Sequence, residues 1–165
     1  MIAKLQPTLF PSSMIRETVS DDVDALLELA KIVQFDIDEL AVIRETLTDY
    51  LKGNSKALWF TAVDRKPVGV IYCEPELMAQ GTWNVLMLLV HPNHQRQGHG
   101  SALMSQVEST LVMQSARLVM VETSSLDEFA RARSFYAKCG YTEEARIRNF
   151  YAPEDDKVVF TKELV

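Results

Sequence analysis

The sequence has only two cysteines, Cys73 and Cys139, and they lie far apart in a chain of 165 residues. A zinc cluster needs ligands in pairs at short spacing, and a small disulfide-stabilised fold needs more cysteines in a shorter chain. We therefore expect two reduced, mostly buried thiols, as in a cytoplasmic protein.

The chain also lacks long hydrophobic runs and an excess of positive charge. No apolar stretch approaches the roughly 20 residues that a membrane-spanning helix needs. Residues 1–13 contain Pro7 and Pro11 and no continuous apolar core, so we expect an N-terminal extension and no signal peptide. With 17 basic and 23 acidic residues the net charge is −6. This balance argues against a general nucleic-acid binder.

What remains is the composition of one soluble globular domain. The chain is 47% hydrophobic and 24% charged, and a chain of this length buries roughly two-thirds of its surface around one core. It contains no internal repeat, low-complexity tract or linker. We expect a single domain over residues 14–165.

The negative charge is concentrated between residues 20 and 49. In this region nine acids stand against two basic residues, Lys31 and Arg44, which gives −7. The acids are Asp21, Asp22, Asp24, Glu28, Asp36, Asp38, Glu39, Glu45 and Asp49. Acidic runs are usually solvated helix faces, and they gain meaning only if those helices border a binding site.

Hydrophobic periodicity predicts helices and strands in alternation. The expected elements are a strand at 14–18, helices at 20–30 and 37–51, strands at 57–63, 68–73 and 82–90, a helix after Gly100, a strand at 117–121, a helix at 127–139 ending at Gly140, and strands at 141–151 and 157–164. The run from Val85 to Val90 is apolar on both faces, which is typical of a central strand covered on both sides. The order predicts one α/β domain with mixed sheet pairing.

The most informative segment is the loop Gln95-Arg96-Gln97-Gly98-His99-Gly100-Ser101, between the buried strand and a helix. Unpaired N–H groups and the positive dipole end make a helix start an anion site. Glycine lets an anion approach those N–H groups, and Arg96 adds a positive charge. The loop lacks the third glycine of the dinucleotide fingerprint and the Gly-Lys-Ser/Thr ending of the Walker loop.

In this context the sequence resembles the GCN5-related N-acetyltransferase (GNAT) superfamily. The resemblance rests on Met14-Ile15-Arg16, on Leu88-Leu89-Val90-His91-Pro92, on the loop from Gln95 to Gly100, and on Phe135-Tyr136-Ala137-Lys138-Cys139-Gly140-Tyr141. It implies a mixed, mostly antiparallel sheet of six or seven strands with about four helices. It also implies an enzyme that transfers an acetyl group from acetyl-CoA to a primary amine by direct attack in a ternary complex.

The resemblance also implies the site residues. The pyrophosphate of acetyl-CoA is expected at the N–H groups of Arg96, Gln97, Gly98, His99, Gly100 and Ser101. The pantetheine arm is expected to pair with Leu88, Leu89 and Val90, with the Leu89 N–H facing the thioester oxygen. Tyr136 matches the general acid that protonates the departing thiolate, because a phenol with a pKa of about 10 suits a thiol with a pKa near 8.5.

The sequence departs from the family pattern at two places. Many members carry an asparagine seven positions before the tyrosine, and Phe129 stands there in this chain. Ser124, Ser125 or Asp127 is expected to take over its hydrogen bond to the cofactor, and the sequence does not choose among them. The strand at 82–90 contains no acid, so the general base is Glu122 or a chain of waters. The alternative for Glu122 is a carboxylate in solvent or in an ion pair.

Other charged and metal-ligating residues near the motif have simpler interpretations. His91, His94 and His99 have no acidic or cysteine partner nearby in the sequence, so no metal is expected. Arg131, Arg133 and Lys138 are solvated charges, or one of them contacts the 3′-phosphate of CoA; these alternatives stay open.

In this fold the first two helices and the last loop border the acceptor. Here they are the −7 region and Glu154-Asp155-Asp156, which favours a cationic acceptor: a small amine, a protein lysine or an N-terminus. Two alternatives to acetyl transfer are a non-catalytic, regulatory acyl-CoA-binding module and a transferase for another acyl-CoA. Homodimers are common in the family, and no residue here indicates one.

Overall fold

The computed structural model describes residues 14–164, so the expected N-terminal extension, residues 1–13, lies outside the described residues. The strands are β1 (Met14–Glu17), β2 (Leu58–Asp64), β3 (Lys66–Pro75), β4 (Thr82–Val90), β5 (Leu118–Ser124), β6 (Thr142–Ala152) and β7 (Asp155–Glu163). The α-helices are α1 (Val23–Ile32), α2 (Ile37–Leu51), α3 (His99–Met113) and α4 (Ala130–Lys138). No helix within residues 14–164 has the length and apolar character to cross a membrane.

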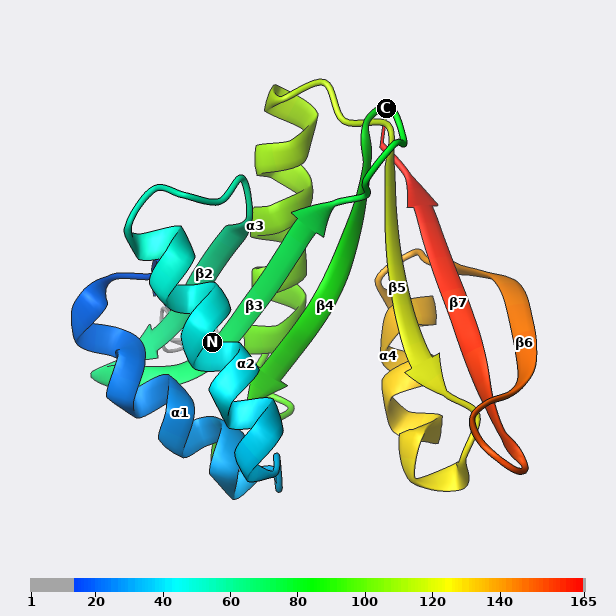
Figure 1. The fold of residues 1–165 in the computed structure, drawn as a ribbon, viewed down its shortest axis with the longest axis horizontal. Coiled ribbons are helices and arrows are strands. Elements are labelled where there is room, and N and C mark those ends of the chain that lie inside the picture. The colour runs from blue at the N-terminus through cyan, green and yellow to red at the C-terminus, as the bar shows by residue number, and fades with distance from the viewer. Residues whose placement is uncertain (1–13, 165) are drawn as a thin grey trace, which may run out of the picture.

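The seven strands form one sheet in the order β1-β2-β3-β4-β5-β7-β6. Every neighbouring pair is antiparallel except β4 and β5, which are parallel (Figure 1). The mixed, mostly antiparallel sheet with four α-helices confirms the predicted fold class. The segment expected as a helix at 127–139 differs in its first turn, because residues Asp127–Phe129 form a 3-10 helix before α4 begins.

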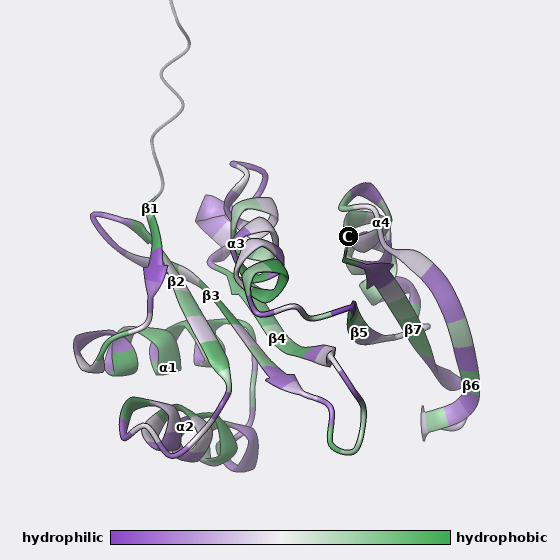
Figure 2. Ribbon diagram, turned by 90° about the horizontal axis from the view of Figure 1, so that it is seen from above, coloured by the Kyte–Doolittle hydropathy of each residue, from purple (hydrophilic) through white to green (hydrophobic). Residues whose placement is uncertain are grey.

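Helices cover the sheet on both faces (Figure 2). On one face, α1 and α2 close a core that contains Leu26, Leu47 and the stacked rings of Trp59 and Tyr72, whose centroids are 4.3 Å apart. On the other face, α3 and α4 pack on a larger core that includes Leu103 and Tyr136. Because both faces are covered, the central strands are apolar on both sides, as the run from Val85 to Val90 indicated.

The sheet opens between β4 and β5 (Figure 1). Their parallel pairing begins at Thr82–Leu118 and ends at Val85–Val121, and beyond it β5 pairs with β7 alone. At the same place β4 has a bulge: Val85 pairs with Cys73 and Met87 with Tyr72, which leaves Leu86 without a partner on β3. A bulge bends and twists its strand, so β4 turns away from β5 where the pairing stops.

A half-buried ion pair between Arg16 and Asp22 joins β1 to the turn before α1, and Asp22 also binds Thr61 of β2. Asp22 is 3% exposed and accepts two hydrogen bonds from the guanidinium of Arg16, at 2.6 and 2.8 Å. Its carboxylate also accepts from the Val19 N–H and from the hydroxyl of Thr61. A buried carboxylate is stable only with such partners, so Asp22 fixes the entry into α1 against the sheet.

We predict that Asp22→Asn lowers the free energy of unfolding by about 2 kcal/mol at pH 7, because charged hydrogen bonds are lost in a buried place. Burial opposes ionisation, but the hydrogen bonds from Arg16 and Val19 outweigh it and hold the pKa of Asp22 below its usual value. The stabilisation is therefore present at neutral pH and lost as the pH falls below the unfolded-state value of about 3.9. Urea denaturation at pH 7 and pH 3 measures the free energy of unfolding of both proteins. Asp21→Asn is the control, because Asp21 is exposed and its substitution is expected to change this free energy little. An equal loss at both pH values would contradict the prediction.

Candidate active site

The open edge of β4 exposes backbone groups on alternate residues. The His91 N–H donates to the Val68 carbonyl at 2.8 Å, and the register with β3 is unbroken from Val90 to Met87. Because antiparallel pairing alternates, the N–H groups of residues 87, 89 and 91 face β3. Those of Leu88 and Val90 face the opening.

This alternation differs from the expectation for Leu89. Its N–H faces Val70 on β3, its neighbour in the register, and its side chain packs against the core under α1 and α2. The structure therefore does not direct the Leu89 N–H toward the opening, and Leu88 supplies the N–H there instead. Leu88 and Val90 line the pocket described below, whereas Leu89 does not.

The loop before α3 leaves the first N–H groups of that helix without internal acceptors. Gly98 is the N-cap residue at φ +86°, and the first helical hydrogen bond runs from the Ala102 N–H to the Gly98 carbonyl. No side chain caps the helix. The N–H groups of His99, Gly100 and Ser101 are therefore available to an anion.

Two glutamine side chains stabilise the loop. Gln95 donates through Nε2 to the Val90 carbonyl, and Gln97 donates to the Asn93 carbonyl, both at 3.2 Å. Arg96 lies between them in the left-handed region, at φ +61°. Gln97, which the sequence placed among the cofactor-binding residues, does not line the pocket, whereas Arg96, Gly98, His99, Gly100 and Ser101 do.

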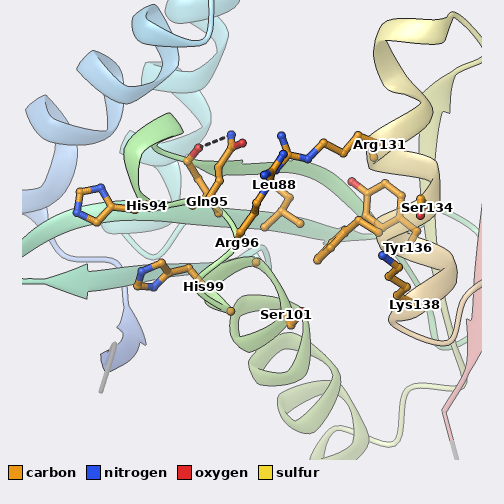
Figure 3. Close-up of a pocket in the computed structure, with 15 residues that line it drawn as sticks. Leu88, His94, Gln95, Arg96, His99, Ser101, Arg131, Ser134, Tyr136 and Lys138 are labelled. Atoms are coloured by element: carbon orange, nitrogen blue, oxygen red, sulfur yellow. Dashed lines mark hydrogen bonds between the residues drawn. The ribbon is translucent and has the colours of Figure 1, made fainter. Parts of the chain in front are cut away.

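A pocket of about 580 Å³ lies between the open edge, this loop and α4. Leu88 and Val90 form its β4 wall, and residues from Arg131 to Lys138 form the opposite wall (Figure 3). Gly100 lies where the walls approach each other: a Cβ atom there would come 3.2 Å from Cζ of Phe135. A side chain at position 100 would therefore press against the Phe135 ring of α4.

Tyr136 projects from α4 into this pocket (Figure 3). It is 8% exposed and packs against the rings of Phe135, Tyr141 and Phe160. Burial, with a smaller effect of Cys139, raises the pKa of Tyr136 to about 12. The phenol thus stays protonated at every ordinary pH, and it is a weaker acid than the usual phenol that the sequence analysis assumed.

Three cationic side chains face the pocket from two sides. Arg96 comes from the loop, and Arg131 and Lys138 come from α4; Figure 3 shows Arg131 extending from α4 toward Arg96. No ion pair of the described residues involves any of the three. Arg133 has a structural role instead, because it donates to the carbonyls of Ser124 and Leu126 at 2.6 and 2.9 Å.

The residues considered as substitutes for the missing asparagine are not in the pocket. Ser124 donates to Asp155 at 2.5 Å, and the hydroxyl of Ser125 accepts from the Asp156 N–H at 2.9 Å. Asp127 lies in the 3-10 helix before α4 and does not line the pocket. The hydroxyl that does line it on α4 is Ser134, which lay outside the motif that the sequence analysis used.

Glu122 alternates with the buried Val121 and so lies on the other face of β5, and it does not line the pocket. Its carboxylate forms an ion pair with Lys157 at 2.7 Å. The ammonium group of Lys157 also lies 3.7 Å above the centroid of the Phe150 ring. The ion pair, one of the alternatives for Glu122, is present.

The three histidines lie at the loop, and His94 and His99 are at the end of the pocket away from Tyr136 (Figure 3). His99 is 2% exposed, and neither ring nitrogen has a partner. Burial, together with His94, lowers the pKa of His99, so it is neutral at pH 7. His94 is paired with Asp64, with Nε2 3.9 Å from Oδ2. Within residues 14–164 no group of three or more potential ligands is placed to hold a metal ion.

Three features meet at this pocket: the open edge of β4, the uncapped N-terminus of α3 and the buried phenol of Tyr136. This is the arrangement of an acyltransferase that uses a CoA thioester. Residues 54–143 match the family described as an acetyltransferase (GNAT) domain, and the chain belongs to this family.

Solved structures agree with the family over nearly the whole chain. A protein from Desulfovibrio desulfuricans described as a GNAT acetyltransferase is 26% identical, with a TM-score of 0.84 over 93% of this chain and 100% of that one. An aminoglycoside 6'-N-acetyltransferase complexed with coenzyme A is 16% identical, with a TM-score of 0.77 over 92% and 97%. The ribosomal-protein-S18-alanine N-acetyltransferase from Escherichia coli is 18% identical, with a TM-score of 0.73 over 92% and 94%. No curated protein matches the sequence.

We predict that Gly98→Ala lowers the free energy of unfolding by about 1 kcal/mol through its backbone conformation alone. The residue has φ +86°, and an added Cβ atom would meet no atom within 4 Å. Gly98→Asn should cost less, because asparagine tolerates the left-handed region better than alanine. Urea denaturation of both variants gives the comparison, and equal losses would contradict this explanation.

Proposed function

We propose that this protein transfers the acetyl group of acetyl-CoA to a primary amine by direct attack in a ternary complex. The observation that carries the proposal is the convergence on one pocket of the open β4 edge, the free N–H groups of α3 and the phenol of Tyr136. Coenzyme A is bound in one of the structurally similar acetyltransferases, and family membership supports the same substrate here.

The proposed cofactor contacts follow from the walls of the pocket. The pyrophosphate accepts hydrogen bonds from the N–H groups of His99, Gly100 and Ser101. Arg96 and Arg131 neutralise it from opposite sides, which relieves the repulsion between two cations that face one pocket. The pantetheine arm pairs with the open edge at Val90, as an additional strand would. The Leu88 N–H, in place of that of Leu89, faces the thioester oxygen.

The proposed reaction uses the lone pair of the amine nitrogen and involves the transfer of two protons. The neutral amine attacks the thioester carbonyl carbon, and the carbonyl oxygen gains negative charge that the Leu88 N–H stabilises. The C–S bond then breaks, and its electron pair leaves on sulfur. One proton leaves the amine nitrogen, and Tyr136 donates another to sulfur, which yields the amide and the thiol of CoA. The phenolate of Tyr136 then regains a proton from solvent, which balances the proton that the amine released.

Glu122 is the proposed acceptor of the amine proton. It lies on β5, the strand that borders the opening, and its ion pair with Lys157 keeps a carboxylate in place there. A proton is required to leave because an ammonium ion has no lone pair. Water is the competing acceptor.

The acidic helices support a cationic acceptor, whether a small amine, a protein lysine or an N-terminus. Most acids of α1 and α2 are exposed, including Asp38 and Glu45. The expected contribution of the last loop is smaller: Asp155 and Asp156 lie in β7 and accept hydrogen bonds from Ser124 and from the Asn149 N–H. The negative potential that attracts the amine therefore comes from α1 and α2.

We predict that Tyr136→Phe lowers kcat about 100-fold, the lower range for loss of a general acid, because the CoA thiolate is a moderate leaving group. Since the pKa of Tyr136 is about 12, its proton is lost only as the pH rises through that value. The wild-type kcat/KM should therefore rise between pH 7 and pH 10 as the amine deprotonates, without a descending limb. Thiol release from acetyl-CoA measures both. A descending limb near pH 10, or full kcat in the variant, would refute the assignment.

We predict that Glu122→Gln lowers kcat/KM for the amine about 100-fold if the carboxylate is the base. Glu108→Gln is the matched control, because Glu108 forms an ion pair of the same 2.7 Å length, with Lys162, away from the pocket. The control should keep its activity. If both variants lose less than threefold, the proton leaves through water and Glu122 has a structural role.

A further inference from the structure

A second cavity lies on the sheet face opposite to the cofactor pocket. This cavity, the α2 groove, has a volume of about 300 Å³ and is lined by residues of α2, β3, β4 and the α1–α2 connection. Leu86 and Met87 form its β4 wall. Leu88, which follows them on the same strand, lines the cofactor pocket. The two cavities thus contact neighbouring residues of β4, all of them beyond the last pair with β5, Val85–Val121.

The lining of the α2 groove is mostly apolar, and part of it is uncovered. Phe35 and Ile43 contribute to it, and Val42 and Leu86 are 58% and 51% exposed. Leu86 is exposed because it is the bulged residue, which β3 does not pair. Aliphatic side chains uncovered in a concave site are typical of a ligand-binding surface.

The polar residues that line the groove are Glu39, Thr46 and Tyr72. Glu39 is the one charged residue that lines it among the described residues. On β3 the Tyr72 hydroxyl donates to the carboxylate of Glu74, while its ring stacks on Trp59 and forms a rigid wall. An occupant that complements these groups has an apolar body and a cationic nitrogen.

We infer that the α2 groove binds the acceptor, and that the acceptor is a small primary amine with one apolar alkyl or aryl arm. The inference rests on the proposed function. With the arm in the groove, Glu39 attracts the charged amine, and transfer then requires its neutral nitrogen to reach the opening beside Leu88. A polyhydroxylated amine would instead place several hydroxyls against Val42 and Leu86, which offer no hydrogen-bond partners, and this is costly.

The first test compares acceptors in the thiol-release assay with acetyl-CoA. The kcat/KM for 2-phenylethylamine and hexylamine should exceed that for methylamine and putrescine by at least about tenfold, because only the first two bury an apolar arm. A preference for methylamine or putrescine would overturn the inference and leave acetyl transfer intact. Better turnover of a peptide with an N-terminal leucine than of 2-phenylethylamine would also overturn it, because the acceptor would then be a polypeptide.

The second test places a charge in the groove. Val42→Asp should lower the ratio of kcat/KM for 2-phenylethylamine over methylamine about tenfold. Val112→Asp is the matched control, because Val112 is 46% exposed on α3 and does not line the groove. Both sites are exposed, so both variants are expected to fold, which thermal unfolding verifies. An unchanged ratio in folded Val42→Asp would refute the groove as the acceptor site.

A measurement of amine binding without turnover distinguishes failure of the groove inference from failure of the proposed function. Calorimetric titration of 2-phenylethylamine into the protein saturated with CoA should detect binding that Val42→Asp weakens about tenfold and Val112→Asp does not. If that binding is present but no amine is acetylated, the groove inference stands and the transfer function fails. If 2-phenylethylamine does not bind, the groove inference fails, whatever the turnover with other amines.

Discussion

The structure depends on the short pairing between β4 and β5. Four residue pairs join these parallel strands, from Thr82–Leu118 to Val85–Val121. Within residues 14–164 they are the only direct strand contact between the part of the sheet that carries β1 to β3 and the part that carries β6 and β7. Had the pairing continued along β4, β5 would have satisfied the backbone groups of Leu88 and Val90, and no edge would be available for a ligand.

The parting of the strands also decides which side chains meet. Helix α3 packs on β2 to β4, whereas α4 packs toward β6 and β7, so residues from the two halves of the chain face each other across the opening. This arrangement brings Arg96 opposite Arg131 and Tyr136 beside Leu88. The bulge at Leu86 has a second effect, because it exposes an aliphatic side chain on the other face of the same strand. One irregularity thereby accounts for a pocket with cationic side chains and an apolar groove, lined by neighbouring residues of β4.

Much of the fold was predictable because its signals are local. The doubly apolar run of β4, the hairpin of β2 and β3, and Gly98 before α3 each depend on residues close in sequence. The assignment of Leu89 failed for a physical reason: side chains and N–H groups alternate along a strand, so the facing of one residue depends on register with a distant strand. The same holds for Ser124 and Ser125, whose hydroxyls bind Asp155 and Asp156 some thirty residues away.

The amino-acid sequence was sufficient for the family, the order of the elements and the position of the glycine-bearing loop, because periodicity, glycine placement and a contiguous motif are properties of short segments. It was not sufficient to decide which N–H groups of β4 face the opening, nor for the pKa of Tyr136 or the α2 groove. Each of these depends on packing between segments far apart in the chain: the β3–β4 register, the burial of a phenol under α4, and a bulge placed against α2. Such contacts form only when the whole sheet is assembled.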